Sequence, residues 1–221
     1  MMKKQLLNWT NIDIVLLDLD GTLLDLNFDN YFWNCYLPKE YSKIFSISED
    51  QAKSFIQDSL AEKAGTLDWY DIDYWSQRLN IDLIKMKEKI SARISAKPNA
   101  KEFLNTISNS GKKLILVTNA HRKTLQIKMR QVNLLKWFDT IVISHELKAA
   151  KESGMFWKKL HSMYNFDINR TVLIDDNEDV LTAAENYGIA NLITIRSPDS
   201  QQPKRNNCKF IAINNFSEIM P

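Results

Sequence analysis

The sequence predicts an α/β fold, a doubly wound parallel sheet with a small helical domain inserted after the first strand. Three observations lead to this prediction. Short apolar runs recur along the chain, amphipathic segments separate them, and one long stretch after the first run carries helical patterns only. Short apolar runs in which polar residues do not alternate with apolar ones are typical of strands that are buried on both faces of a parallel sheet.

Six apolar runs are the expected strands, and they cover residues 14–17, 114–117, 140–143, 171–174, 191–195 and 210–213. Amphipathic segments that predict helices lie between them, at residues 100–110, 124–132, 154–164 and 180–187. Strand and helix alternate regularly in this part of the chain, which indicates a Rossmann-like parallel sheet with helices on both faces.

The stretch 26–98 contains no convincing strand and predicts four helices. The first runs from Asp29 into the early 40s. The second begins at Ser48, which forms the capping-box pattern Ser-x-x-Gln with Gln51. Asp68 and Asp82 are the expected N-caps of the third and fourth. We therefore predict an α/β core of residues 1–25 and 99–221 and a helical cap of residues 26–98.

The composition narrows the classes of partner. Of 221 residues, 44% are hydrophobic and 25% charged, and the net charge is +2 with both signs interleaved. This balance argues against nucleic acid or an anionic membrane as the main partner. The two cysteines lie far apart in no metal-binding pattern, and no apolar stretch is long enough for a signal peptide or a membrane span. The expected location is the cytoplasm.

Polar residues follow the first expected strand. Asp18 and Asp20 are two positions apart, so in an extended chain their carboxylates share a face. Gly21 permits a sharp turn that brings backbone amides close to a ligand. Two adjacent carboxylates repel each other unless a cation or a proton lies between them. The carboxyl ends of such strands are where open α/β sheets bind ligands.

Further polar residues follow the next three strands. Thr118 and Asn119 offer a hydroxyl and backbone amides that suit phosphate oxygens. Lys151, which we expect to open a helix, could neutralise a phosphate charge, and Lys148 is a rival for that role. Asp175 and Asp176 supply hard oxygen ligands of the kind that Mg²⁺ prefers.

These residues, in this order and spacing, resemble the four motifs of the haloacid dehalogenase (HAD) superfamily. The helical stretch resembles the cap that this superfamily inserts after its first strand. Within the superfamily, residues 23–33, 69–70, 73–76 and 118–121 look like those of bacterial GMP/IMP nucleotidases. This resemblance implies a helical lid and a purine nucleoside 5′-monophosphate as substrate.

The resemblance also implies a mechanism. Asp18 would attack phosphorus and form an aspartyl-phosphate, and Asp20 would act as general acid and then as general base, which requires a raised pKa. The implied Mg²⁺ ligands are Asp18, the backbone oxygen of Asp20, Asp176, and Asp175 directly or through water. Which of Asp175 and Asp176 binds directly stays open. The residues implied to bind and stabilise the phosphoryl group are Gly21, Thr118, Asn119 and Lys151.

The substrate contacts are less defined by the sequence. The candidates are the cap aromatics Phe32, Trp33, Tyr70 and Trp75, and His121 after the second strand. Aromatics at helical spacing are also typical of a cap interior. Alternatives to a nucleotidase are a phosphatase for phosphoglycolate or a sugar phosphate, a phosphomutase, or a non-catalytic binding domain. We expect a monomer or a weak homodimer.

Overall fold

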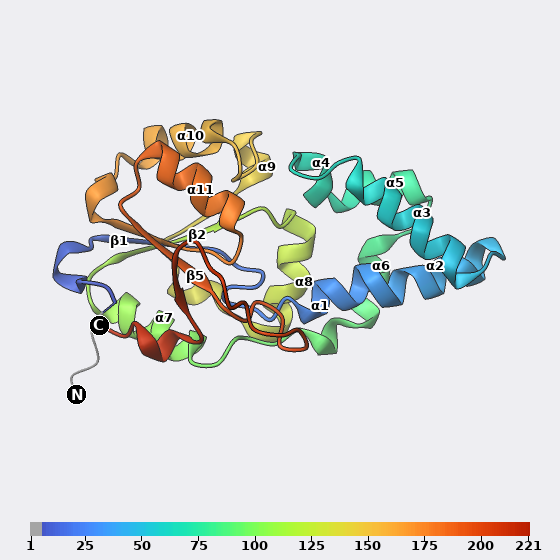
Figure 1. Cartoon of the computed structure of the whole chain (residues 1–221), viewed down its shortest axis with the longest axis horizontal. Coiled ribbons are helices and arrows are strands. Elements are labelled where there is room, and N and C mark those ends of the chain that lie inside the picture. The colour runs from blue at the N-terminus through green and yellow to red at the C-terminus, as the bar shows by residue number, and fades with distance from the viewer. Residues whose placement is uncertain (1–5) are drawn as a thin grey trace.

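The computed structural model describes residues 6–221 and contains one six-stranded parallel sheet (Figure 1). Its order is β3-β2-β1-β4-β5-β6. After β1, the chain adds β2 and β3 on one side of that strand and then β4, β5 and β6 on the other. The strand order therefore reverses between β1 and β4, which is where such sheets bind ligands. The strands are β1 (Ile14–Leu17), β2 (Lys113–Thr118), β3 (Thr140–Ile143), β4 (Thr171–Ile174), β5 (Asn191–Ile195) and β6 (Ile211–Ile213).

Helices cover both faces of the sheet, as the short apolar strands predict. Along β1, Val15 and Leu17 pack into one buried cluster with α7 (Ala100–Asn109) and α8 (Arg122–Val132). Leu16 packs into the other, with α10 (Gly154–Tyr164) and α11 (Glu178–Tyr187). In Figure 1, α10 and α11 lie above the sheet and α7 lies below it. The doubly wound α/β fold is confirmed.

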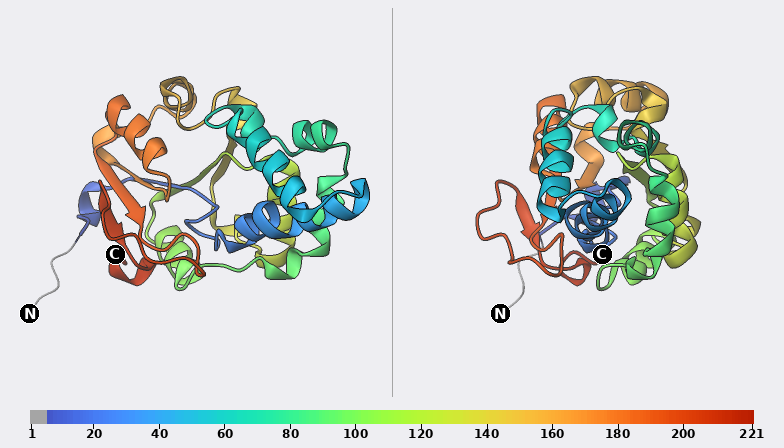
Figure 2. Two further views of the ribbon diagram at one scale, coloured as in Figure 1. Left: turned by 45° about the vertical axis from the view of Figure 1, so that its right-hand side comes forward. Right: turned by 90° about the vertical axis from the view of Figure 1, so that its right-hand side faces the viewer.

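The stretch after β1 is helical and lies to one side of the sheet (Figures 1 and 2). It has its own buried apolar cluster, which includes Phe32, Leu37, Ile56 and Trp75. We use the word cap for residues 26–98, and the domain boundaries themselves stay a prediction. The helices are α1 (Asn27–Tyr31), a π-helical turn (Phe32–Tyr36), α2 (Leu37–Phe45), α3 (Glu49–Ala61), α4 (Leu67–Tyr70), α5 (Ile72–Leu79) and α6 (Leu83–Lys89).

The helix caps agree with the sequence at two positions and differ at one. Ser48 and Gln51 form the capping box of α3, and Asp82 caps α6. The expectation of one helix beginning at Asp68 was wrong, because Asp68 lies inside α4. The break comes at Asp71, whose carboxylate accepts hydrogen bonds from the amides of Asp73 and Tyr74 and so starts α5 as a separate helix.

The remaining elements are short. Helix α9 (Ser144–Leu147), which the sequence did not predict, directly follows β3. The longest described helix, α3, has 13 residues. None of the helices in residues 6–221 has both the length and the hydropathy needed to cross a membrane. The 3₁₀ turns cover Trp9–Asn11, Ser91–Arg93, Leu135–Trp137, Ile168–Arg170 and Phe216–Glu218.

Candidate active site

Three carboxylates meet where the sheet order reverses. Asp18 follows β1, and Asp175 and Asp176 follow β4, which pairs with β1 in parallel. One carboxylate oxygen from each of the three lies within 4.8 Å of the other two. All three residues are buried, with exposed fractions between 1% and 8%. Like charges this close in a buried site repel each other unless a cation or a proton lies between them.

Lys151 supplies part of that positive charge. Its Nζ lies 2.5 Å from Oδ1 of Asp18 and 2.6 Å from Oδ2 of Asp175. Burial acts to lower the pKa of the Lys151 ammonium, but the Asp175 and Asp18 carboxylates outweigh it and raise that pKa. Lys151 does not open a helix as expected, because it lies in the turn before α10, whose N-cap is Ser153. The rival Lys148 is exposed at the end of α9.

The Lys151 ammonium and the Arg205 guanidinium, which lies 3.8 Å from Oδ2 of Asp176, do not neutralise three carboxylates. Oδ2 of Asp18 is buried and has no hydrogen-bond partner among residues 6–221. Burial raises the pKa of Asp175 to about 7, and burial together with the Asp18 and Asp175 charges raises that of Asp176 well above its usual value. A cluster of hard oxygen donors that is short of positive charge fits a divalent cation.

Gly21 makes room for this cluster. Its φ is +87°, in the left-handed region, and a Cβ at this position would lie 2.5 Å from Cγ and Oδ2 of Asp176. Any side chain would therefore strain the backbone and collide with the carboxylate. The requirement for glycine thus arises from close approach to Asp176 as well as from the turn.

Asp20 faces a different lysine. Its Oδ1 lies 2.6 Å from Nζ of Lys128, which is buried on α8. Burial raises the pKa of Asp20 to about 6, although Lys128 opposes that rise and the Asp29 and Asp18 carboxylates add to it. A carboxyl group that titrates near neutral pH can both donate and accept a proton under physiological conditions.

Lys128 also belongs to a row of alternating acidic and basic side chains that the sequence did not predict. Its Nζ also lies 2.6 Å from Oδ2 of Asp29 on α1, whose Oδ1 lies 2.7 Å from Nζ of Lys87 on α6. Burial acts to raise the pKa of Asp29, but the two ammonium groups lower it overall. One sequence signal existed, since Lys128 occupies an inward position in the apolar stripe of α8, between Leu125 and Val132.

Thr118 ends β2 beside these groups, and Asn119 follows it in the loop. Oγ1 of Thr118 accepts a hydrogen bond from the amide of Ala120 at 3.0 Å, which fixes the turn into α8. Oδ1 of Asn119 accepts the amide of Lys151, also at 3.0 Å. The loop after β2 therefore holds the Lys151 backbone in place.

A cavity of about 650 Å³ opens over this site, between the sheet and the cap. Of the residues that we expected to bind substrate, Trp33, Tyr70 and His121 line it. Phe32 and Trp75 are instead fully buried in the apolar cluster of the cap and do not belong to the described lining. They fall on the inner side of their helices, where aromatic side chains hold the cap together.

The sequence family described as haloacid dehalogenase-like hydrolase matches residues 15–193. This range contains Asp18, Asp20, Asp175 and Asp176. The chain belongs to this family. It is therefore an enzyme of the hydrolase class, built on the HAD-like fold that the sequence predicted.

Two curated relatives of this hydrolase are nucleotidases of Escherichia coli. A GMP/IMP nucleotidase is 32% identical over 213 residues, 96% of each chain. A pyrimidine 5′-nucleotidase is 25% identical over 191 residues, 80% of this chain and 84% of the relative. Among solved structures, an HAD phosphatase from Thermococcus onnurineus superposes with a TM-score of 0.77 at 19% identity, covering 94% of this chain and 96% of the other. That similarity supports the fold.

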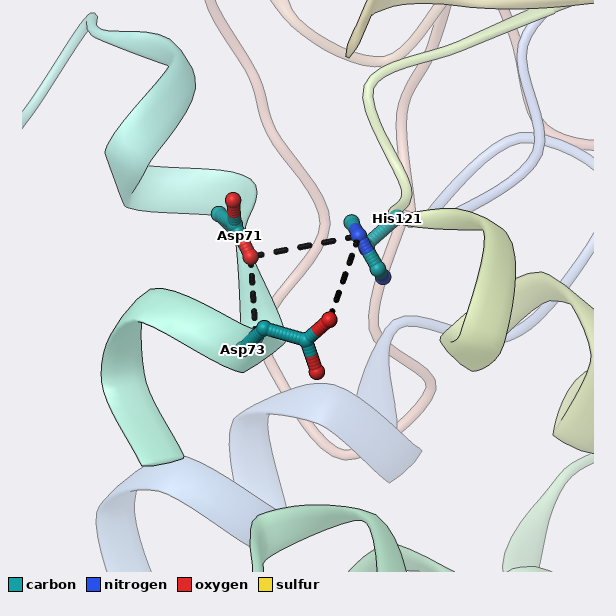
Figure 3. A group of neighbouring side chains, drawn as sticks. All are labelled: Asp71, Asp73 and His121. Atoms are coloured by element: carbon teal, nitrogen blue, oxygen red, sulfur yellow. Dashed lines mark hydrogen bonds and ion pairs between the residues drawn. The ribbon is translucent and has the colours of Figure 1, made fainter. Parts of the chain in front are cut away.

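A second group of possible metal ligands joins the cap of this hydrolase to its core (Figure 3). Nε2 of His121 lies 3.9 Å from Asp71 and 4.0 Å from Asp73. Both oxygens of Asp73 already lie 2.7 Å from Nζ of Lys123, and Asp71 caps α5. These contacts describe a partly exposed ionic seam between cap and core, in which each acidic side chain already has a partner.

Proposed function

We propose that this hydrolase is a Mg²⁺-dependent phosphatase that removes phosphate from purine nucleoside 5′-monophosphates such as GMP and IMP. The observation that carries the proposal is the cluster of Asp18, Asp175 and Asp176 with Lys151, facing a cavity that the cap helps to line. The purine substrate is supported by the 32% identity with a GMP/IMP nucleotidase over almost the whole chain.

Asp18 is the proposed nucleophile. One of its oxygens attacks phosphorus, the bond from phosphorus to the nucleoside oxygen breaks, and an aspartyl-phosphate forms. Water then attacks the same phosphorus and returns Asp18 as a free carboxylate.

Asp20 is the proposed acid and base. It gives a proton to the leaving oxygen in the first step and takes one from water in the second, so its pKa of about 6 suits both steps. Lys151 stabilises negative charge on the phosphoryl group together with Thr118, and the amides after β2 and at Gly21 surround the phosphate oxygens.

A bound Mg²⁺ would neutralise charge on the phosphoryl oxygens and on the carboxylates. The residues that would hold it are Asp18, Asp176 and the backbone oxygen of Asp20. Asp176 is the better direct ligand of the adjacent pair, because Asp175 already accepts hydrogen bonds from Lys151 through Oδ2 and from the Asn177 amide through Oδ1. Asp175 would then bind through water.

The cap wall of the cavity is the proposed nucleoside site. Trp33, Trp69 and Tyr70 line it from the cap, and His121 lines it from the start of α8. A purine ring offers a large flat face for contact with such aromatic side chains. Phe32 and Trp75 support this wall from within the cap.

Phosphate release from a panel of phosphomonoesters tests the proposal. The panel contains GMP, IMP, AMP, UMP, phosphoglycolate and hexose phosphates, each with Mg²⁺ and with EDTA, and Asp18→Asn is the control. The expected result is release from GMP and IMP that EDTA and the substitution abolish. Equal rates across the panel would contradict the proposed preference for purine nucleotides and would favour a general phosphatase. An isomerised sugar phosphate without free phosphate would indicate a phosphomutase. Inactivity on every substrate would favour the alternative of a non-catalytic binding domain.

A further inference from the structure

Glu152 joins three loops of the core to the cap, and the sequence analysis did not single it out. Its Oε2 accepts a hydrogen bond from Nδ2 of Asn119 at 3.0 Å, in the loop after β2. Its Oε1 accepts one from Nδ2 of Asn177 at 3.2 Å, in the loop after β4. The same oxygen accepts the hydroxyl of Tyr70, which ends α4 in the cap.

All three donors to Glu152 are neutral. Within residues 6–221 the carboxylate forms no ion pair, because the neighbouring Lys151 ammonium is directed at Asp18 and Asp175. A partly buried carboxylate without a cation partner depends on hydrogen bonds for its stabilisation, and hydrogen bonds to a charged group are the stronger kind. The Glu152 position is therefore fixed by Asn119, Asn177 and Tyr70 together.

The hydrogen bonds continue from Glu152 to the phosphate-binding lysine. Glu152 holds the amide nitrogen of Asn119, and the amide oxygen of the same Asn119 accepts the backbone N–H of Lys151 at 3.0 Å. Glu152 follows Lys151 in the chain, and Asn119 adds a second connection from the Glu152 carboxylate to the Lys151 backbone N–H. Tyr70 is the point at which the cap joins this path, because Asn119, Glu152 and Lys151 all belong to the core.

Tyr70 is suited to be a donor at this point. Burial and the Glu152 carboxylate both raise the pKa of its phenol, so the hydroxyl keeps its proton. Its ring also lines the cavity, next to the space that a substrate would fill. Figure 1 shows α4 at the edge of the cap nearest α9, which places this contact at the junction of the two parts.

We propose that Glu152 is a positioning residue, which makes the placement of Lys151 and Asn119 depend on the docking of the cap through Tyr70. Glu152 itself touches no reacting atom in this arrangement. The phosphate-binding groups would be fully ordered only when the cap is in place, so that catalysis is favoured after the cavity has closed. This proposal rests on the function proposed above.

The test compares Tyr70→Phe, Glu152→Gln and the double variant in the full-length chain. Tyr74→Phe is the matched control, since its hydroxyl accepts a hydrogen bond from Arg78 at 3.4 Å and so acts within the cap. With GMP and Mg²⁺ we expect Tyr70→Phe to lower kcat about tenfold, the scale of one hydrogen bond to a charged group, with little change in KM. Glu152→Gln should lower kcat at least as much. The double variant should lower kcat no more than Glu152→Gln alone.

Hydrogen exchange at the Lys151 amide gives a readout independent of activity. Tyr70→Phe and Glu152→Gln should both speed exchange in the peptide that contains this amide, whereas Tyr74→Phe should not. The proposal is overturned if Tyr70→Phe matches Tyr74→Phe in both kcat and exchange, or if the two losses multiply in the double variant. A wild-type enzyme without phosphatase activity would refute the proposed function, and the exchange measurement would then decide the Glu152 linkage by itself.

Discussion

Lys151 and Lys128 are both buried at the site, and each ammonium group lies between two carboxylates. Lys151 joins Asp18 to Asp175, and both acids follow strands of the core. Lys128 joins Asp20 to Asp29, which comes from the cap. The first lysine therefore serves the groups that would bind and attack phosphate, and the second holds the proposed acid and base and ties it to the cap.

The comparison shows why only one of the two was found in the sequence. Lys151 lies in the turn between α9 and α10, at the spacing of a known motif. Lys128 lies within a helix, where a lysine normally marks the solvent side. Its partners become visible only when α1, α6 and α8 are brought together, so the pairing is a property of the tertiary structure.

The largest effect is expected at Lys151. Lys151→Met should lower kcat for phosphate release about 10³-fold, because the phosphoryl group loses a charge partner in a buried site. Lys151→Arg should recover only part of this loss, since the guanidinium is larger and the site is closely packed. Initial rates with saturating GMP give the measurement. A loss below about tenfold would mean that Lys151 is structural.

Lys128→Met should have a smaller effect that depends on the leaving group. We expect kcat with GMP to fall about 10²-fold, the scale of general acid catalysis, because Asp20 loses its orientation. The burst of nitrophenolate in the first turnover with p-nitrophenyl phosphate should fall much less, because that leaving group needs no proton. Arg122→Met is the control, because Arg122 is exposed on the same helix and pairs with Glu146 of the core. A burst that is lost to the same extent as kcat with GMP would contradict an action through Asp20.

The acids beside the two lysines predict a pH dependence of stability. The pKa values of Asp175 and Asp20 are raised to about 7 and about 6, so between roughly pH 4 and pH 7 the metal-free folded chain holds protons that the unfolded chain has released. The free energy of unfolding should therefore fall as pH rises through this window. Bound Mg²⁺ would displace protons from the cluster of Asp18, Asp175 and Asp176, so it should raise Tm more at about pH 8 than at about pH 5. An equal shift at both would argue against metal binding at these carboxylates.

The smallest effect is expected at the seam between cap and core. Asp73→Asn weakens the contact with Lys123, which is more than half exposed. Exposed ion pairs contribute little free energy, so KM for GMP should change by less than about threefold. Steady-state kinetics at low and high salt provide the check. A tenfold rise in KM would make this seam, rather than the buried Lys128 chain, the main connection to the cap.

The sequence predicted most of the fold because buried parallel strands leave short apolar runs that are readable without tertiary contacts. Asp18, Asp20 and Asp175 were found for the same reason, since they follow β1 and β4, and Lys151 was found from its spacing to them. Glu152 and Asp29 were not, because their importance depends on partners that lie distant in sequence. The helical spacing of Phe32 and Trp75 could not show which side of the cap helices faces the cavity.

The central claim is that Asp18 takes up the phosphoryl group. The direct measurement is mass spectrometry of Asp20→Asn after rapid mixing with p-nitrophenyl phosphate and acid quenching. This variant should still form the intermediate, because the leaving group needs no acid, but it should hydrolyse it slowly for lack of a base. We predict a peptide heavier by one HPO₃ group at Asp18. Nitrophenolate release with no such peptide, or with the group on another residue, would contradict the account.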